Sequence, residues 1–149
     1  MNLPDVNLWL AAILSGHSHH KEARSWLESQ ENTGEILLCR VTQQGVLRLL
    51  TTEAVMGCYG IAPLGNRAAW EVMEAFLADE RIVFASEPPG LDKVWRSLSL
   101  RETHSPKLWM DAYLAAFALC KGARLVTTDK AFSQFEGLYL HLLNRQKKR

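Results

Sequence analysis

Hydrophobic residues recur every three or four positions along several stretches of the chain, and each such stretch predicts a helix with one buried face. The stretch from about Ser18 to Gln30 is a clear example. There Ala23, Trp26 and Leu27 share one face, while charged residues occupy the other. The same period predicts further helices at about 6–14, 42–51, 67–78 and 91–98, and one that ends before a turn at Lys121-Gly122.

Short, continuous apolar runs lie between these helices and are typical of strands that are buried on both faces. They are residues 35–39, 82–85, 125–128 and 138–142, with residues 1–5 as a short extended start. Glycine and proline mark breaks, notably in the predicted loop at 56–66 and at Pro88-Pro89-Gly90. Helices that alternate with buried strands predict a three-layer α/β/α sandwich on a short, mostly parallel sheet.

The bulk composition is that of an ordinary globular protein and predicts one domain over residues 1–149. The net charge of +1 provides no overall field for a polyanion, so any such site must be a local patch. Three cysteines without metal-type spacing indicate reduced thiols, and no apolar run is long enough to span a bilayer. We therefore expect a cytoplasmic protein that does not insert into membranes. Its basic tail, 145–149, is either a phosphate-binding arm or a frayed terminus.

Three aspartates occupy positions that this fold would bring to one edge of the sheet. Asp5 follows the first strand, Asp129 follows the run at 125–128, and Asp111 lies within the predicted helix that precedes that run. In open parallel sheets, ligands bind beyond the carboxyl ends of the strands. We therefore expect Asp5, Asp111 and Asp129 to lie close together.

Each aspartate also has a simpler explanation. Asp5 and Asp129 both precede helical stretches and can act as N-caps. Ser105-Pro106 predicts the start of the helix that contains Asp111, which would place Asp111 in the second turn, too deep for a cap. Asp111 could instead reach water or Arg124 from the edge of its helix face.

Converging carboxylates repel one another unless a cation offsets their charge. Carboxylate oxygens without accompanying histidine or cysteine ligands favour Mg²⁺ or Mn²⁺ over Zn²⁺. Such an ion can lower the pKa of water and neutralise the developing charge on a phosphodiester. Asn7 and Thr127 are placed to support Asp5 and Asp129.

Four motifs, taken in order, resemble those of the PIN-domain nucleases, and most closely the VapC-type toxins of bacterial toxin–antitoxin pairs. They are Asp5-Val6-Asn7, Thr42-x-x-Gly45-x-x-Arg48, Asp111-x-x-Leu114-Ala115-Ala116 and Thr127-Thr128-Asp129-x-x-Phe132. Each motif is weak alone, but their order and spacing are specific, and the resemblance covers essentially the whole chain.

The resemblance implies a Mg²⁺- or Mn²⁺-dependent endoribonuclease in which water attacks the RNA phosphodiester. It also implies a homodimer and a cognate antitoxin protein that inserts a peptide into the active site. Carried over by position, Asp5, Asp111 and Asp129 would be the catalytic, metal-binding acids, and Thr127 would support them.

One position departs from the family pattern. Where these toxins commonly carry a glutamate, this chain has Gln43, which offers a carbonyl oxygen but no charge. We expect weaker metal binding as a result, and a catalytically weak or inactive PIN-fold module that binds RNA or protein is the alternative. A phosphotransfer domain with Asp5 or Asp129 as phospho-acceptor is a third reading.

Several basic residues could contact RNA around the expected site. Arg40, Lys107 and Lys130 flank its rim and could position the RNA backbone. Arg48, one turn beyond Gln44, could bind a phosphate or pair with an acid.

Overall fold

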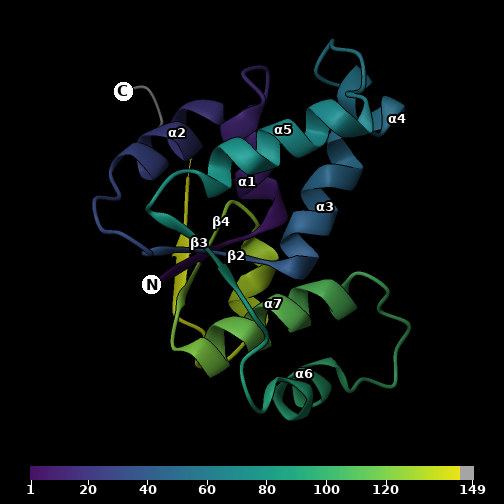
Figure 1. Ribbon diagram of the computed structural model, residues 1–149. Helices are drawn as coiled ribbons and strands as arrows, with labels where there is room; N and C mark the ends of the chain where they lie inside the picture. The colour runs from purple at the N-terminus through teal and green to yellow at the C-terminus, as the bar shows by residue number, and fades with distance from the viewer. Residues whose placement is uncertain (145–149) are drawn as a thin grey trace, which may run out of the picture.

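The structure is a computed structural model that describes residues 1–144, and five parallel strands form a single sheet at its centre (Figure 1). The strand order is β3-β2-β1-β4-β5. The strands are β1 (Asn2–Pro4), β2 (Ile36–Cys39), β3 (Ile82–Ala85), β4 (Arg124–Thr127) and β5 (Leu140–Leu142). The predicted strands are therefore all present, and the sheet is parallel throughout.

Helices cover both faces of the sheet, which confirms the predicted three-layer sandwich. In Figure 1, α2 and α5 lie above the strands, and α6 and α7 lie below them. The α-helices are α1 (Val6–Ile13), α2 (His20–Glu28), α3 (Arg40–Leu50), α4 (Glu53–Gly57), α5 (Asn66–Leu77), α6 (Leu91–Ser99) and α7 (Leu108–Lys121). A short 3₁₀ helix, η1 (Lys130–Gln134), follows β4.

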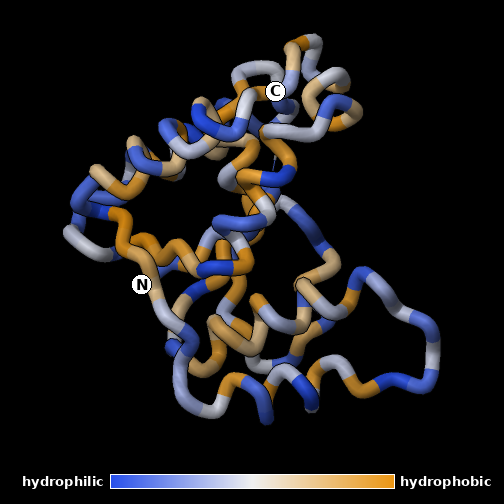
Figure 2. Tube along the Cα trace, turned by 45° about the vertical axis from the view of Figure 1, so that its right-hand side comes forward, coloured by the Kyte–Doolittle hydropathy of each residue, from blue (hydrophilic) through white to orange (hydrophobic). Residues whose placement is uncertain are grey.

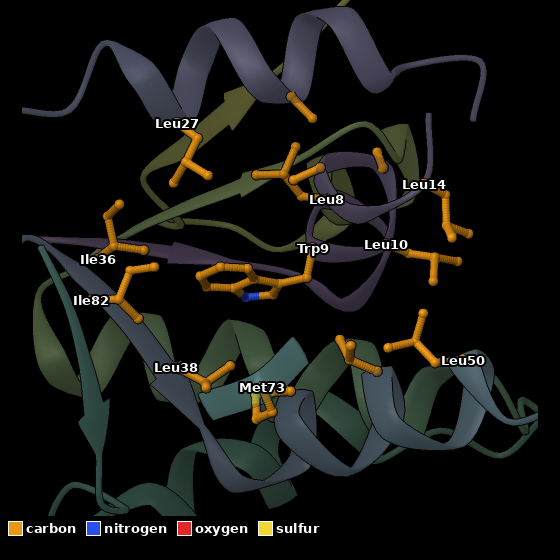
Figure 3. Close-up of a cluster of buried hydrophobic side chains, with 14 of the residues drawn as sticks. Leu8, Trp9, Leu10, Leu14, Leu27, Ile36, Leu38, Leu50, Met73 and Ile82 are labelled. Atoms are coloured by element: carbon orange, nitrogen blue, oxygen red, sulfur yellow. The ribbon is translucent and has the colours of Figure 1, made fainter. Parts of the chain in front are cut away.

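The hydrophobic core is divided into two clusters by the sheet. One cluster joins α1, α2, α3 and α5 to the sheet, and Trp9 lies at its centre (Figure 3). The second cluster joins α6, α7 and η1 to the opposite face and includes Phe117, whose side chain is fully buried. Apolar segments lie along the interior strands in Figure 2, while the outer helices alternate between apolar and polar residues.

The order of the strands creates a crevice between β1 and β4. From β1 the chain moves outward to β2 and β3, then returns through α6 and α7 to add β4 on the other side of β1. This reversal is a topological switch point, the place where ligands bind in open α/β sheets. The register pairs Pro4 with Val126, so Asp5 and Thr127 follow side by side at the carboxyl ends of the two strands.

The structure corrects two local predictions. The predicted loop at 56–66 is partly helical, because α4 extends into its beginning and Asn66 already opens α5. Ser105 does not cap α7, which begins at Leu108 with Lys107 at the N-cap position and no side-chain cap. The Ser105 carbonyl instead accepts a backbone hydrogen bond from Leu108, and its hydroxyl contacts that of Thr103.

Other helix and strand boundaries agree with the prediction to within two residues. The basic tail, 145–149, lies outside the described residues. Within residues 1–144, no helix has both the length and the apolar character that a membrane span requires.

Candidate active site

Asp5 is held rigidly in a buried position at the end of β1. Its side chain is only 3% exposed and accepts a 2.7 Å hydrogen bond from the Leu8 amide, so it caps α1 as the sequence allows. Its other carboxylate oxygen accepts a 2.6 Å hydrogen bond from the hydroxyl of Thr127. Capping and a ligand role are compatible here, because each carboxylate oxygen can accept more than one bond.

Thr127 connects two of the three predicted acids. While its hydroxyl donates to Asp5, the same oxygen accepts a 2.9 Å hydrogen bond from the Asp129 amide. Asp129 in turn caps η1 by accepting a hydrogen bond from the Ala131 amide at 2.8 Å. This chain of hydrogen bonds fixes the spacing between Asp5 and Asp129 through a fully buried side chain.

Asp111 approaches the site from α7. Because α7 begins at Leu108 rather than near Ser105, Asp111 lies in the first turn of the helix and not in the second. It nevertheless makes no capping hydrogen bond. Arg124, the partner considered as an alternative, lies at the opposite end of β4 and donates to Asn2. The half-buried Asp111 carboxylate is therefore available to a ligand.

The electrostatics of the site disfavour three ionised carboxylates. Burial raises the pKa of Asp5 to about 7, against the opposing hydrogen bonds from Thr127 and Leu8, and the charges of Asp129 and Asp111 raise it further. Burial and the charge of Asp129 also raise the pKa of Asp111, although Lys107 lowers it. Ion pairs within residues 1–144 join only Arg24 to Glu28 and Arg81 to Asp79, so none neutralises the site.

These residues fit a divalent metal ion that prefers oxygen ligands. The charges of Asp111 and Asp129 raise the pKa of Asp5, and the charge of Asp129 raises the pKa of Asp111, so a cation would remove this repulsion. Within the described part of the chain, however, no three His, Cys, Asp or Glu side chains form a ready-made metal site. The fit therefore depends on the charge and the oxygen donors of the acids, and the side chains must close around the ion.

A cleft of about 570 Å³ opens beside these acids. Asp111 and Asp129 line it, whereas Asp5 lies behind them in the protein interior. The lining also includes Arg101 and Lys107, from the segment between α6 and α7, and Gln134 of η1. Arg101 and Gln134 had no distinctive pattern in the sequence, since neither belongs to a motif.

Gln43 lies in the first turn of α3, at the same edge of the sheet, and is 4% exposed. Its side-chain oxygen accepts a short hydrogen bond from Arg40, whose guanidinium also lies 4.4 Å from the centre of the Phe84 ring. Arg40 is therefore engaged in packing and does not line the acidic cleft. Lys130 does not line it either.

Two of the predicted supporting residues form no bond to the acids. Asn7 is exposed, and its side chain forms no hydrogen bond with any residue in 1–144, so it does not support Asp5 as expected. Arg48 pairs with no acid in the described residues and lines a separate hollow with Trp70 and Asn66, between α3 and α5.

The fold and this site define the class of protein. Residues 3–138 match the model of the PIN domain, and the chain belongs to the PIN-domain family. Within that family it belongs to the VapC branch. It is 55% identical over 144 residues to Ribonuclease VapC41 of Mycobacterium tuberculosis, covering 96% of this chain and 99% of that protein. The family resemblance drawn from the motifs is thus confirmed.

Solved structures share the fold at much lower identity. The M. tuberculosis toxin VapC20, described as cleaving the Sarcin-Ricin loop, matches with a TM-score of 0.66 and 19% identity over 93% of this chain and 98% of its own. VapBC-1 of nontypeable Haemophilus influenzae matches with a TM-score of 0.62 and 14% identity over 95% and 97% of the two chains. Both likenesses support the architecture described above.

Proposed function

We propose that the protein is a Mg²⁺- or Mn²⁺-dependent endoribonuclease and the toxin of a toxin–antitoxin pair. The observation that supports this proposal is that Asp111 and Asp129 line one cleft, while Thr127 links Asp129 to the buried Asp5 at the switch point between β1 and β4. The 55% identity to a protein named as a VapC ribonuclease supports RNA as the substrate.

Asp5, Asp111 and Asp129 would hold the ion. When bound, Mg²⁺ or Mn²⁺ would acidify water and offset the negative charge that develops on the phosphodiester. Asp5 keeps its place through the bonds from Leu8 and Thr127, and the ion would favour its ionised form. Asp111, which lines the cleft, would hold the ion from the side open to substrate.

The same proposal includes protein partners. VapBC-1, a structural neighbour, carries in its name both parts of a toxin–antitoxin pair, and we infer that this chain also has a cognate antitoxin. We further infer a homodimer, on the family resemblance. A small neighbouring reading frame that encodes a DNA-binding protein would identify the antitoxin.

The decisive experiment is a cleavage assay on a mixed RNA pool with Mg²⁺ or Mn²⁺. Asp111→Asn should abolish cleavage while the circular dichroism spectrum stays unchanged, because α7 does not use this carboxylate as a cap. Glu71→Gln, which removes an exposed acid on α5, is the matched control and should cut like the parent. Equal cleavage by Asp111→Asn and the parent would refute the proposed mechanism. No cleavage by the parent would favour a binding module that does not cut.

A further inference from the structure

The lining of the cleft includes two cations that form no ion pair with an acid in residues 1–144. Arg101 lies in the segment between α6 and α7, and Lys107 lies at the N-cap position of α7. Both side chains are exposed, both line the cleft, and neither forms an ion pair within residues 1–144. In Figure 2 this segment projects from the body of the molecule and is mostly hydrophilic.

Gln134 holds the side chain of Arg101, and a hydrogen bond to the backbone fixes the side chain of Gln134 in turn. The Gln134 amide group donates a 2.9 Å hydrogen bond to the Ala131 carbonyl, which leaves its oxygen free to accept. That oxygen accepts a 2.5 Å hydrogen bond from one terminal nitrogen of Arg101, across 33 residues of sequence. A guanidinium group has five N–H donors in a planar fork, so the remaining donors of Arg101 stay available to a phosphate.

Helix stability does not explain the position of Lys107. A basic residue at the start of a helix opposes the helix dipole, and Lys107 provides no cap for α7. Lys107 stands four residues before Asp111 and influences its pKa, yet the two side chains form no ion pair. Its ammonium group is thus left free at the mouth of the cleft.

We propose that Arg101, oriented by Gln134, and Lys107 form a binding site for RNA phosphates that flank the bond to be cut. The site rests on the proposed function, because it shares one cleft of about 570 Å³ with Asp111 and Asp129, two of the acids that would carry out cleavage. It binds single-stranded RNA through its backbone and contributes to placement of the substrate, without selecting a base. Arg101 and Lys107 contact phosphate, and Gln134 is a positioning residue.

Binding can be measured apart from cleavage, with a fluorescein-labelled single-stranded RNA of mixed sequence in EDTA at several salt concentrations. Arg101→Gln and Lys107→Gln should each weaken binding about tenfold at low salt. Each should also reduce the slope of log affinity against log salt by about 0.7, the value for one lost phosphate contact on a single strand. The affinity of the double variant should fall by approximately the product of the two single fold-changes.

Matched variants separate a phosphate contact from a merely structural one. Arg67→Gln removes an exposed arginine from α5, on the opposite face of the sheet, and should leave both affinity and slope unchanged. Gln134→Leu should weaken binding about threefold at an unchanged slope, because Arg101 keeps its charge but loses its orientation. Arg101→Lys should recover part of the affinity that Arg101→Gln loses.

Cleavage kinetics give an independent result. If the flanking phosphates bind equally in the ground state and the transition state, Arg101→Gln should raise KM and change kcat less than twofold. Parental affinity and slope in the double variant, an equal loss in Arg67→Gln, or a parent that does not bind RNA at low salt would each overturn the inference. A parent that binds in this pattern but cuts no RNA would leave the phosphate site standing and refute the proposed nuclease.

Discussion

The hydroxyl of Thr127 donates a 2.6 Å hydrogen bond to the carboxylate of Asp5, across 122 residues of sequence, and both side chains are buried. The bond joins the ends of β1 and β4 at the switch point of the sheet. It favours the ionised form of Asp5, in opposition to the burial that raises the pKa of this group to about 7. The pair therefore controls how much of the site is charged near neutral pH.

Thr127→Val should raise the pKa of Asp5 above its present value, because the substitution removes the bond that lowers it and preserves the shape of the side chain. At subsaturating Mg²⁺, the acidic limb of the pH–rate profile should move to higher pH. Thr127→Ser retains the hydroxyl and should keep the parental profile. Coincident profiles for the valine variant and the parent would show that this bond does not tune the site.

Asp5→Asn should stabilise the metal-free protein above neutral pH. The pKa of Asp5 in the folded state, about 7, exceeds the ordinary aspartate value of 3.8, so the folded state binds this proton more tightly than the unfolded state does. The parent should therefore lose stability as the pH rises from about 4 to about 7, by up to a few kcal/mol at about 1.4 kcal/mol per pKa unit. Asparagine does not titrate and should lack this loss.

Thermal unfolding in EDTA between pH 4 and pH 8 tests this expectation. The difference in Tm between Asp5→Asn and the parent should increase toward the alkaline end, whereas Glu71→Gln should follow the parent throughout. A constant difference across the range would contradict a raised pKa for Asp5. RNA cleavage by Asp5→Asn should be abolished, as the proposed role of this carboxylate requires.

Gly45 allows α1 and α3 to pack closely, and Gly45→Ala should destabilise the protein. A Cβ at this position would lie 2.8 Å from Cγ2 of Val6, the residue that directly follows Asp5. Overpacking of this kind costs about 1–3 kcal/mol. The better helix propensity of alanine recovers about 1 kcal/mol of that loss, so the net loss of stability should be up to about 2 kcal/mol. Cleavage should also fall, since Val6 cannot move without disturbing Asp5.

A double-mutant cycle with Val6→Ala isolates this contact. The loss of unfolding free energy in the double variant should be about 1 kcal/mol smaller than the sum of the losses in the two single variants. The reason is that the smaller side chain at position 6 removes the clash. Gly57→Ala is the control, since a Cβ there meets nothing within 4 Å, and its stability should match or slightly exceed that of the parent. Strictly additive effects in chemical denaturation would show that the helices shift apart without strain.

The sequence predicted the sheet and the three layers correctly, because each depends on a local pattern. Continuous apolar runs identify buried strands, and Asp5 and Asp129 stand directly after strands whose ends must meet. The start of α7 was predicted wrongly because Ser105 has the chemistry of a cap but lies outside the helix. The Arg101–Gln134 contact could not be predicted, since it joins two irregular segments through side chains alone.

Gln43 occupies the position at which the family resemblance implies a glutamate. Gln43→Glu would add a negative charge to a buried position at the edge of the sheet where the ion is proposed to bind, and should tighten Mn²⁺ binding. The gain should be only a few-fold, because Arg40, which now donates to Gln43, would pair with the new carboxylate and absorb part of its charge. Gln44→Glu, at the adjacent exposed position on α3, supplies the same charge without the burial and should leave the affinity unchanged. Isothermal titration with Mn²⁺ distinguishes the two variants, and equal affinities for both would mean that Gln43 lies outside the influence of the metal.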